Sequence, residues 1–249
     1  MTDTPIALQL YTVRDALDAD FEGTIRKLAE MGYTAVEAAD FPAGVTPQSA
    51  KTLFDSLGLT VSSAHSKPPL GDNRNAALEK LDALGCDYMV IPWLDPDPYF
   101  VDLDGIKRAC DLLNESNEVA QGAGLTLAYH NHWFEPVMID GKTGFQHMLD
   151  YMDERIVFEL DVYWTKVGGL DPVETVKELN PRMPLLHLKD GPAEAIEQDM
   201  TAVGSGTVDI PAIVSASEAK WHIVELDRCA TDMLDAVAQS LTYLKGLQS

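Results

Sequence analysis

Apolar segments recur at regular intervals along the chain, and polar, helix-like segments separate them. They are IALQLYTV (6–13), TAVEAA (34–39), LTVSSAH (59–65), YMVIPWL (88–94), LTLAYH (125–130), IVFELDVYW (156–164), LLHLKD (185–190) and WHIVELD (221–227). Several of them are nearly continuous in apolar residues, as is typical of parallel strands that helices cover on their outer face. The pattern therefore predicts eight buried, parallel strands.

Start and stop signals bound the amphipathic segments between these strands. Asp20 precedes a helical pattern that ends at Gly32, and Thr46-Pro47 has the form of a cap followed by a first helical residue. Further helices are expected over 75–84, 104–121 and 231–244, and after Asp171 and Asp209. Eight strand–helix units in 249 residues predict an α/β fold, a single (β/α)8 TIM barrel domain over residues 1–249. A doubly wound open sheet is disfavoured, because no glycine-rich phosphate turn follows the first strand.

The net charge of the chain limits the classes of partner that it can bind. Acidic residues number 40 against 18 basic ones, which gives a net charge of −22. Such a surface repels nucleic acid and anionic lipid, and no apolar run is long enough to span a membrane. We therefore expect neither nucleic-acid nor membrane partners. The acidic surface is explained either by solubility alone or by adaptation to high salt, which screens self-repulsion.

The cysteines and the N-terminal residues bear on location. Cys86, Cys110 and Cys229 are far apart in the sequence and match neither a zinc motif nor a disulfide framework. The N-terminal stretch MTDTPIALQL has no basic region ahead of an apolar one, as a secretory leader would. We therefore expect buried thiols and a cytoplasmic location.

Polar residues gather at the predicted carboxyl ends of the strands, where barrels of this type carry their chemistry. Their positions are Gln9, Tyr11, Arg14, Glu37, Asp40, His65, Lys67, Trp93, Asp95, His130, Asn131, His132, Glu135, Glu159, Asp161, Trp164, His187, Lys189, Asp190, Glu225 and Asp227. Imidazoles and carboxylates that converge on one barrel mouth suit Mn²⁺, Co²⁺, Zn²⁺ or Fe²⁺. The alternative is a set of hydrogen-bonded structural histidines. Trp93 and Trp164 are either sugar-stacking platforms or core aromatics.

Five motifs together carry a family resemblance: LQLYTVRD, YHNHWFE, ELDVYW, HLKD and VELD. The chain resembles the sugar phosphate isomerase/epimerase group of the xylose isomerase-like TIM barrels, from Ile6 to about Leu247. The resemblance implies one divalent metal ion (Mn, Co, Zn, Fe or Mg) with ligands at His130, Asp161, His187 and Glu225. Many relatives have glutamate at the position of His130, and His132 is the alternative ligand.

The resemblance also implies a function. It predicts a metal-dependent isomerase or epimerase that abstracts a proton α to a carbonyl of a sugar or keto-sugar, through a metal-stabilised enediolate. Glu225 is the first candidate base and Lys189 the second, with a pKa lowered by burial and by the metal. His132 is the candidate acid on the other side. The residues expected at the substrate are His65, Gln9, Tyr11, Trp93, Trp164 and Glu159.

The sequence leaves other functions open. His130 favours a lyase or dehydratase that acts on a 3-keto sugar or inosose, since a symmetrical pair of glutamates is missing. A barrel that binds sugar without turnover is a further alternative, whereas a nuclease is disfavoured by the acidic surface. The expected partner is a small-molecule sugar or keto-sugar, and a homo-oligomer is left open.

Overall fold

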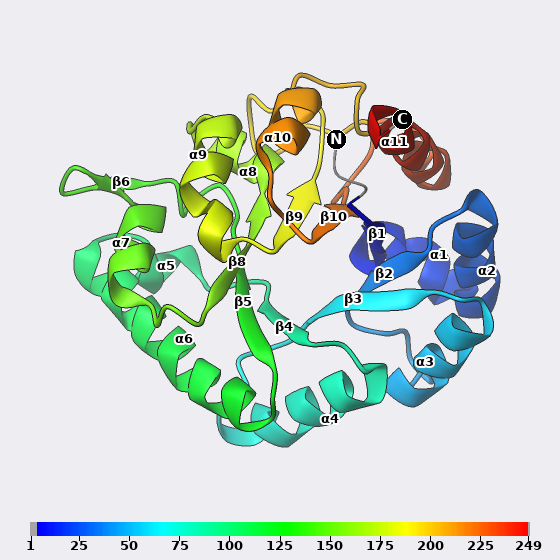
Figure 1. Ribbon diagram of the computed structural model, residues 1–249, viewed down its shortest axis with the longest axis horizontal. Helices are drawn as coiled ribbons and strands as arrows, with labels where there is room; N and C mark the ends of the chain where they lie inside the picture. The colour runs from blue at the N-terminus through cyan, green and yellow to red at the C-terminus, as the bar shows by residue number, and fades with distance from the viewer. Residues whose placement is uncertain (1–3, 249) are drawn as a thin grey trace.

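A closed barrel of eight parallel strands forms the centre of the protein (Figure 1). The computed structural model describes residues 4–248. The order around the barrel is β1-β10-β9-β8-β5-β4-β3-β2. The strands are β1 (Ile6–Gln9), β2 (Ala35–Ala38), β3 (Thr60–His65), β4 (Tyr88–Ile91), β5 (Thr126–His130), β8 (Val157–Asp161), β9 (Leu185–Leu188) and β10 (Trp221–Val224). The predicted (β/α)8 barrel is confirmed.

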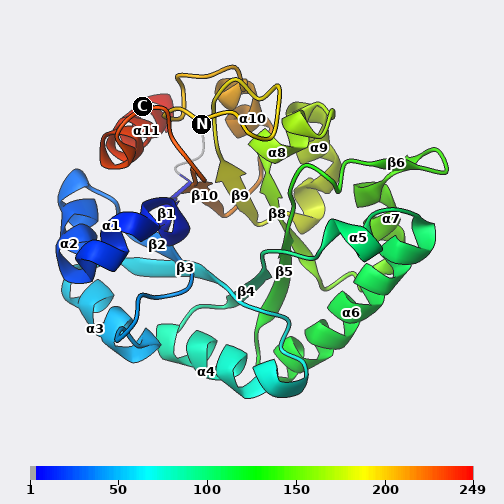
Figure 2. The same ribbon diagram turned by 180° about the vertical axis from the view of Figure 1, so that it is seen from behind.

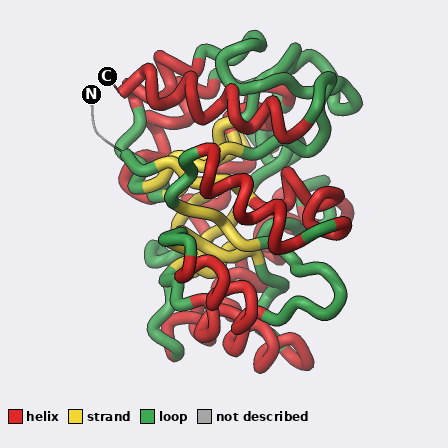
Figure 3. Tube along the Cα trace, turned by 90° about the vertical axis from the view of Figure 1, so that its right-hand side faces the viewer, coloured by secondary structure: helices red, strands yellow, loops and turns green. Residues whose placement is uncertain are grey.

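Helices surround the barrel in both face-on views, and the side view shows the strands between them (Figures 1, 2 and 3). They are α1 (Arg14–Ala19), α2 (Phe21–Met31), α3 (Pro47–Ser56), α4 (Arg74–Leu84), α5 (Pro96–Tyr99), α6 (Leu103–Gly122), α7 (Gly144–Tyr151), α8 (Val162–Val167), α9 (Pro172–Leu179), α10 (Ile210–Ala216) and α11 (Met233–Gln248), with short 3-10 helices η1 (Leu10–Val13), η2 (Gly71–Asn73) and η3 (Asn180–Arg182). Among the described residues, no helix combines the length and hydropathy that crossing a membrane requires.

The predicted helix boundaries follow from capping. The side chain of Asp20 accepts a hydrogen bond from the Gly23 backbone N–H at 3.0 Å, and Gly32 ends α2 with a left-handed φ of 98°. Thr46 and Ser49 form a reciprocal capping box at the start of α3. Each cap satisfies backbone groups that a helix end leaves without partners.

All eight strands are shorter than their predicted segments, and in β1 and β8, where the difference is largest, a polar side chain marks where the strand stops. Asp161 accepts a hydrogen bond from the Trp164 backbone N–H at 2.8 Å, so the run 156–164 changes from β8 to α8 at this residue. Gln9 accepts one from the Tyr11 N–H at 3.0 Å, and residues Leu10–Val13 form η1. The apolar runs continue into these helices because both are buried against the barrel. A small antiparallel hairpin, β6 (Met138–Ile139) and β7 (Lys142–Thr143), was not expected from the sequence.

The apolar core has two parts. The larger part lies between the barrel and its helices. The smaller part fills the amino-terminal half of the barrel interior and is made of mostly small residues, which are Ala7, Ala35, Val90, Ala128, Leu185 and Ile223. All three cysteines are free, and Cys229 is only partly buried, whereas burial of all three was expected.

Candidate active site

A polar layer lies directly above the apolar layer inside the barrel. Successive side chains alternate between the two faces of a strand, so a residue two positions further along points to the same interior. In five strands the residue two positions after an interior apolar one is polar and buried: Gln9, Glu37, His130, His187 and Glu225. The carboxyl half of the barrel is therefore filled with charged and hydrogen-bonding groups.

The first group in this layer is the Glu37 cluster, which consists of Glu37, His65, Glu159 and His187. His187 Nε2 lies 2.7 Å from Glu37 Oε1 and 3.2 Å from Glu159 Oε2. His65 Nε2 lies 3.3 Å and 2.9 Å from the same two oxygens. Each imidazole thus faces both carboxylates. A register shift between β2 and β3 leaves one extra residue in β3 between Val61 and Ser63, so that Ser63 lies opposite Glu37.

Electrostatics in the Glu37 cluster favour charged histidines. Burial alone would lower the pKa of His65, but Glu37 and Glu159 outweigh it and raise that pKa to about 10. The pKa of His187 is likewise held well above its ordinary value by the same two carboxylates and Glu225, against burial. Burial would raise the pKa of Glu37, yet the two histidines hold it well below its usual range. The cluster binds a positive charge strongly, whether that charge is protons or a cation.

The second group is the Glu225 cluster, which consists of His130, Asp161, His187 and Glu225 and shares His187 with the first. One donor atom from each residue lies within 4.8 Å of those of the others. His187 Nδ1 lies 2.8 Å from Glu225 Oε2, and His130 Nε2 lies 3.9 Å from Asp161 Oδ2. This cluster contains the four ligands expected from the sequence, brought together from β5, β8 and β9 and from the residue after β10.

A lysine ammonium lies between the carboxylates of the Glu225 cluster. Lys189 Nζ is 2.9 Å from Asp161 Oδ2, 2.7 Å from Glu225 Oε2 and 2.9 Å from Asp227 Oδ2. Burial would lower the pKa of Lys189, but the three carboxylates outweigh it and hold that pKa well above its ordinary value. The lowered lysine pKa expected from the sequence is therefore wrong for the chain itself, because three buried acids surround the ammonium.

Several buried polar atoms of both clusters have no hydrogen-bond partner among the described residues. They are His130 Nδ1, Glu159 Oε1 and Asp161 Oδ2. Asp161 Oδ2 does contact Lys189, although without the geometry of a hydrogen bond. Buried polar atoms rarely stay unpaired, so atoms of this kind point to an ion, water or ligand. Two imidazoles and two carboxylates, in either cluster, are a donor set that suits a divalent transition-metal ion.

A cavity of 830 Å³ opens above the polar layer. Its walls include the aromatic side chains of Tyr11, Phe41, Trp93, Trp133 and Trp164, and His65, His130, His132, Glu225 and Asp227 also line it. The indole N–H of Trp93 donates to Asp95 at 2.9 Å, which fixes the exposed ring beside His132, with ring centroids 4.5 Å apart. Flat apolar walls over a polar floor suit a sugar, which has apolar faces and hydroxyl edges.

The long loop between β9 and α10 is fastened by one carboxylate. Asp190 Oδ1 accepts hydrogen bonds from the backbone N–H groups of Gly191 (2.8 Å) and Val208 (3.0 Å). Its Oδ2 accepts from those of Gly204 and Gly206, both at 2.9 Å. A Cβ atom at Gly206 would lie 2.2 Å from Asp190 Oδ1, so only glycine fits there. The acid after HLK thus holds the loop rather than the substrate.

The chain that forms this barrel matches a known family. A family model described as the xylose isomerase-like TIM barrel matches residues 25–222. The chain belongs to this family. No curated protein matches the chain.

Solved structures support the same grouping within the xylose isomerase-like TIM barrels. Two structures of sugar phosphate isomerase/epimerase from Parabacteroides distasonis ATCC 8503 are each 26% identical to the chain. One covers 98% of this chain and 94% of its own, with a TM-score of 0.79; the other covers 97% and 98%, with a TM-score of 0.83. The IolI protein, whose structure contains a zinc atom, is 14% identical with a TM-score of 0.77 over 98% of this chain and 97% of its own, which shows the fold alone.

The residues expected at the substrate fall into two groups in this xylose isomerase-like barrel. Tyr11, His65, Trp93 and Trp164 line the cavity, and so does the candidate acid His132. Gln9 and Glu159 are fully buried and do not line it. Gln9 instead donates to Glu37 Oε1 at 2.6 Å, and Glu159 belongs to the Glu37 cluster.

The environment of His132, the candidate acid, favours its uncharged form. Burial, together with Lys189, lowers the pKa of His132 to about 3, so its imidazole is neutral near pH 7. Such a ring has no imidazolium proton to donate. A neutral imidazole of this kind still offers one hydrogen-bond donor and one acceptor.

Glu37 is the residue that sequence reasoning missed. The sequence places it at the end of the second strand but does not link it to the other site residues. Its neighbours in TAVEAA give no local sign of chemistry. The only available signal was the position of an acid inside an otherwise apolar strand, which is costly unless the acid is paired.

Proposed function

We propose that the protein is a divalent-metal-dependent isomerase or epimerase of a sugar or keto-sugar. The observation that carries the proposal is the convergence of His187, Glu225 and Lys189, with further imidazoles and carboxylates, directly beneath an aromatic-walled cavity that Glu225 lines. His187 belongs to both clusters, and one divalent ion would be held by His187 with the other three donors of one of them. When bound, such an ion polarises a carbonyl and stabilises the negative charge that develops during proton abstraction.

Glu225 is the base in this proposal. Burial would raise its pKa, but Lys189 and His187 hold that pKa well below the usual range, so the carboxylate is ionised. Its side chain lies at the cavity wall and is held in place by His187 Nδ1 at 2.8 Å. A carboxylate oriented in this way accepts a proton from the carbon next to a carbonyl.

Lys189 is the acid. Its ammonium lies 2.7 Å from Glu225, so the acid and the base act at the same edge of the substrate. It would return a proton to the carbon or oxygen that becomes basic during the reaction. Asp161 and Asp227 hold the ammonium at that point.

A lyase or dehydratase of a 3-keto sugar is the second candidate, and His130 favours it. Burial, reinforced by the neighbouring histidines and Lys189, holds the pKa of His130 well below its ordinary value, so this ring is neutral. The end of β5 thus carries an imidazole and not a carboxylate. Glu225 therefore has no second carboxylate opposite it across the substrate. One carboxylate base with one ammonium acid suits removal of an α proton followed by loss of a β-oxygen.

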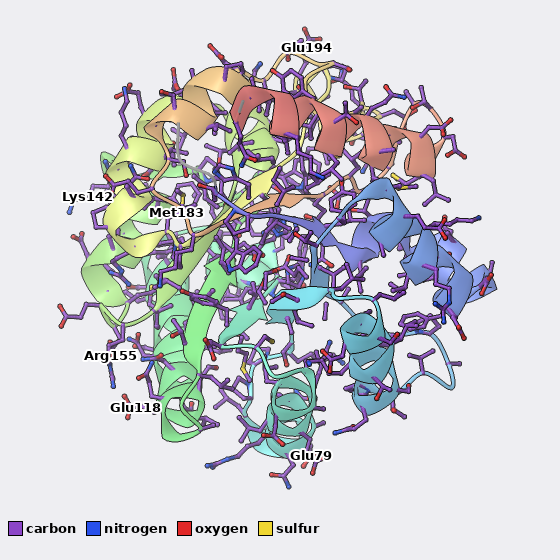
Figure 4. The ribbon with its side chains drawn as sticks, turned by 45° about the vertical axis from the view of Figure 1, so that its right-hand side comes forward. Glu79, Glu118, Lys142, Arg155, Met183 and Glu194 are labelled. Atoms are coloured by element: carbon purple, nitrogen blue, oxygen red, sulfur yellow. The ribbon has the colours of Figure 1, made fainter. Side chains whose placement is uncertain are left out.

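Exchange in D₂O tests the proposal. The metal-loaded protein is incubated with keto-sugars of different ring size, and deuterium at the α carbon is followed by NMR and mass spectrometry. We expect exchange that stops on chelation, returns with added Mn²⁺ and falls at least ~100-fold in Glu225→Gln. Glu118→Gln, the same chemical change on the outer surface (Figure 4), should leave it unchanged.

The products separate the candidates. An epimer or isomer supports the first function, and an unsaturated product supports the lyase. Binding of sugars without any exchange would refute both and leave a binding protein.

A further inference from the structure

The geometry of the two clusters differs, although their chemistry is similar. In the Glu37 cluster the four donor atoms lie within 4.8 Å of one another, and their N···O separations are 2.7, 2.9, 3.2 and 3.3 Å. Donors in a tetrahedral zinc site lie about 2.0–2.2 Å from the ion, so they are roughly 3.3–3.5 Å from one another. The Glu37 cluster needs only a small expansion to reach this arrangement.

The residues around the Glu37 cluster hold its donors in position. The second ring nitrogen of His187 is hydrogen-bonded to Glu225 Oε2 at 2.8 Å, which aims Nε2 at the cluster. Gln9 donates to Glu37 Oε1 at 2.6 Å, and Ser63 donates to Glu37 Oε2 at 2.5 Å. Metal-binding histidines commonly bond a carboxylate through their other nitrogen, and metal-binding carboxylates are hydrogen-bonded in turn.

The cations of the chain also distinguish the clusters. The ammonium of Lys189 lies within 3 Å of carboxylate oxygens of both Asp161 and Glu225. Within residues 4–248, the only cationic side chains that form ion pairs with Glu37 or Glu159 are histidines. A dication in the Glu225 cluster would therefore lie beside a resident ammonium and be repelled by it, whereas the Glu37 cluster presents only imidazoles and carboxylates.

We infer that a single divalent cation binds in the Glu37 cluster, through Glu37, His65, Glu159 and His187, and not in the Glu225 cluster. His65 lines the cavity and offers the ion a route to it. Asp161, Glu225 and Lys189 then stay free to hold and move protons above the ion. This inference rests on the proposed metal dependence, but it concerns the position of the ion and not the reaction.

Matched variants test the position of the ion. Glu37→Gln and His65→Asn alter residues unique to the Glu37 cluster, whereas Asp161→Asn and His130→Asn make the same changes in the Glu225 cluster. The affinity of chelator-stripped protein for Co²⁺ and Zn²⁺ is measured by calorimetry, with visible absorption of Co²⁺ as a second readout. We expect a loss of at least ~100-fold for the first pair, more than outer partners usually contribute, and less than ~5-fold for the second.

Each result decides the question. The reverse pattern, equal loss in both pairs, or no binding by the wild-type protein would overturn the inference. If Glu37→Gln does not fold, as circular dichroism will show, the wild-type crystal soaked in Zn²⁺ decides, since anomalous scattering must appear within about 2.0–2.2 Å of both Glu37 and His65. Absence of sugar exchange together with the expected affinities would refute the proposed function and leave the ion site standing.

Discussion

Single buried charges determine what this site can do, and Lys189 is the clearest of them. Its side chain is fully buried, and its ammonium contacts three carboxylates. Removal of one partner from a buried ion pair is strongly destabilising, because the remaining charges lose their compensation. The lysine is thus a structural counter-charge, and in the proposed function it is also the acid.

Lys189→Met is expected to lower the free energy of unfolding by about 3–5 kcal/mol, because Asp161, Glu225 and Asp227 are left without their cation. Urea denaturation measures the change, and the exchange reaction should be lost as well. Lys142→Met removes an exposed partner of Asp150 on the surface (Figure 4) and should leave both measurements as in the wild type. Unchanged stability in Lys189→Met would show that the ammonium is not the counter-charge.

Glu135 links stability to pH. Burial raises its pKa from 4.5 to about 8, although Tyr129 and the backbone N–H of His132 donate to it. The folded protein thus keeps a proton that the unfolded chain releases. Its stabilising contribution is complete below about pH 4.5 and is lost as the pH rises to about 8.

We expect the melting temperature of Glu135→Gln to fall less between about pH 5 and pH 9 than that of the wild type. This range of about four pH units includes the pKa of Glu135 in the folded protein. The amide can still accept from the His132 N–H and bond Tyr129, so packing is preserved. Scanning calorimetry across this range measures the difference, with the exposed Glu79→Gln as control (Figure 4). Parallel curves for Glu135→Gln and the wild type would contradict a protonated Glu135.

At the scale of elements, the loop between β9 and α10 depends on Asp190. Four backbone N–H groups donate to its carboxylate. Hydrogen bonds to a charged group are worth more than neutral ones, and a carboxylate can accept all four at once.

Asp190→Asn should lower the free energy of unfolding by about 3 kcal/mol. The amide NH₂ group replaces one carboxylate oxygen and cannot accept the hydrogen bonds that this oxygen received from two backbone N–H groups. Hydrogen exchange at Gly204 and Gly206 should accelerate before that of the barrel strands. Asp209→Asn makes the same change at the cap of α10, where asparagine caps as well as aspartate, and should leave the loop protected. Slow exchange in Asp190→Asn would assign the loop another anchor.

The strands and helices were predictable to different degrees. Apolar runs located all eight barrel strands because each strand is buried on both faces, and caps located the main helices. The predicted segments are longer than the strands, most of all at β1 and β8, because apolar residues continue into η1 and α8, where Gln9 and Asp161 begin a helix from within the run. The hairpin of β6 and β7 is too short to leave a periodic pattern.

The parts of the site that follow from the barrel fold alone were predictable from the sequence. Parallel strands bring their carboxyl ends together, and on this basis His130, Asp161, His187, Glu225 and Lys189 were expected at one mouth. Contacts across the barrel were not predictable, because they depend on the curvature and register of the closed sheet. The pairing of His187 with Glu37 joins β9 to β2, and no local pattern in either strand encodes it.

At the scale of the whole molecule, acidity dominates. The net charge is −22, and labelled acids such as Glu79, Glu118 and Glu194 lie on the outside of the ribbon (Figure 4). Like charges on a folded surface repel one another and oppose the compact state. This field also opposes contact with nucleic acid, so we expect none.

Added KCl should stabilise the protein. At 1 M salt the screening length falls to about 3 Å, which removes repulsion between separated surface acids. We expect the melting temperature to rise by at least about 3 °C between 0.05 and 1 M KCl, roughly 1 kcal/mol for a chain of this size. A flat or falling melting temperature would leave solubility as the explanation for the acidic surface.

The seam of the barrel has a consequence for biosynthesis. Ile6 of β1 pairs with His222 of β10, so the ring shuts between segments that leave the ribosome early and late. Domains usually fold as units once their residues have emerged. Until β10 emerges, the barrel is not closed, so Glu37 and His65 do not yet face the residues on its opposite side. Glu225 is then still absent. In the proposed function, a nascent chain that stops before residue 221 would therefore be inactive, even if its helices had already folded.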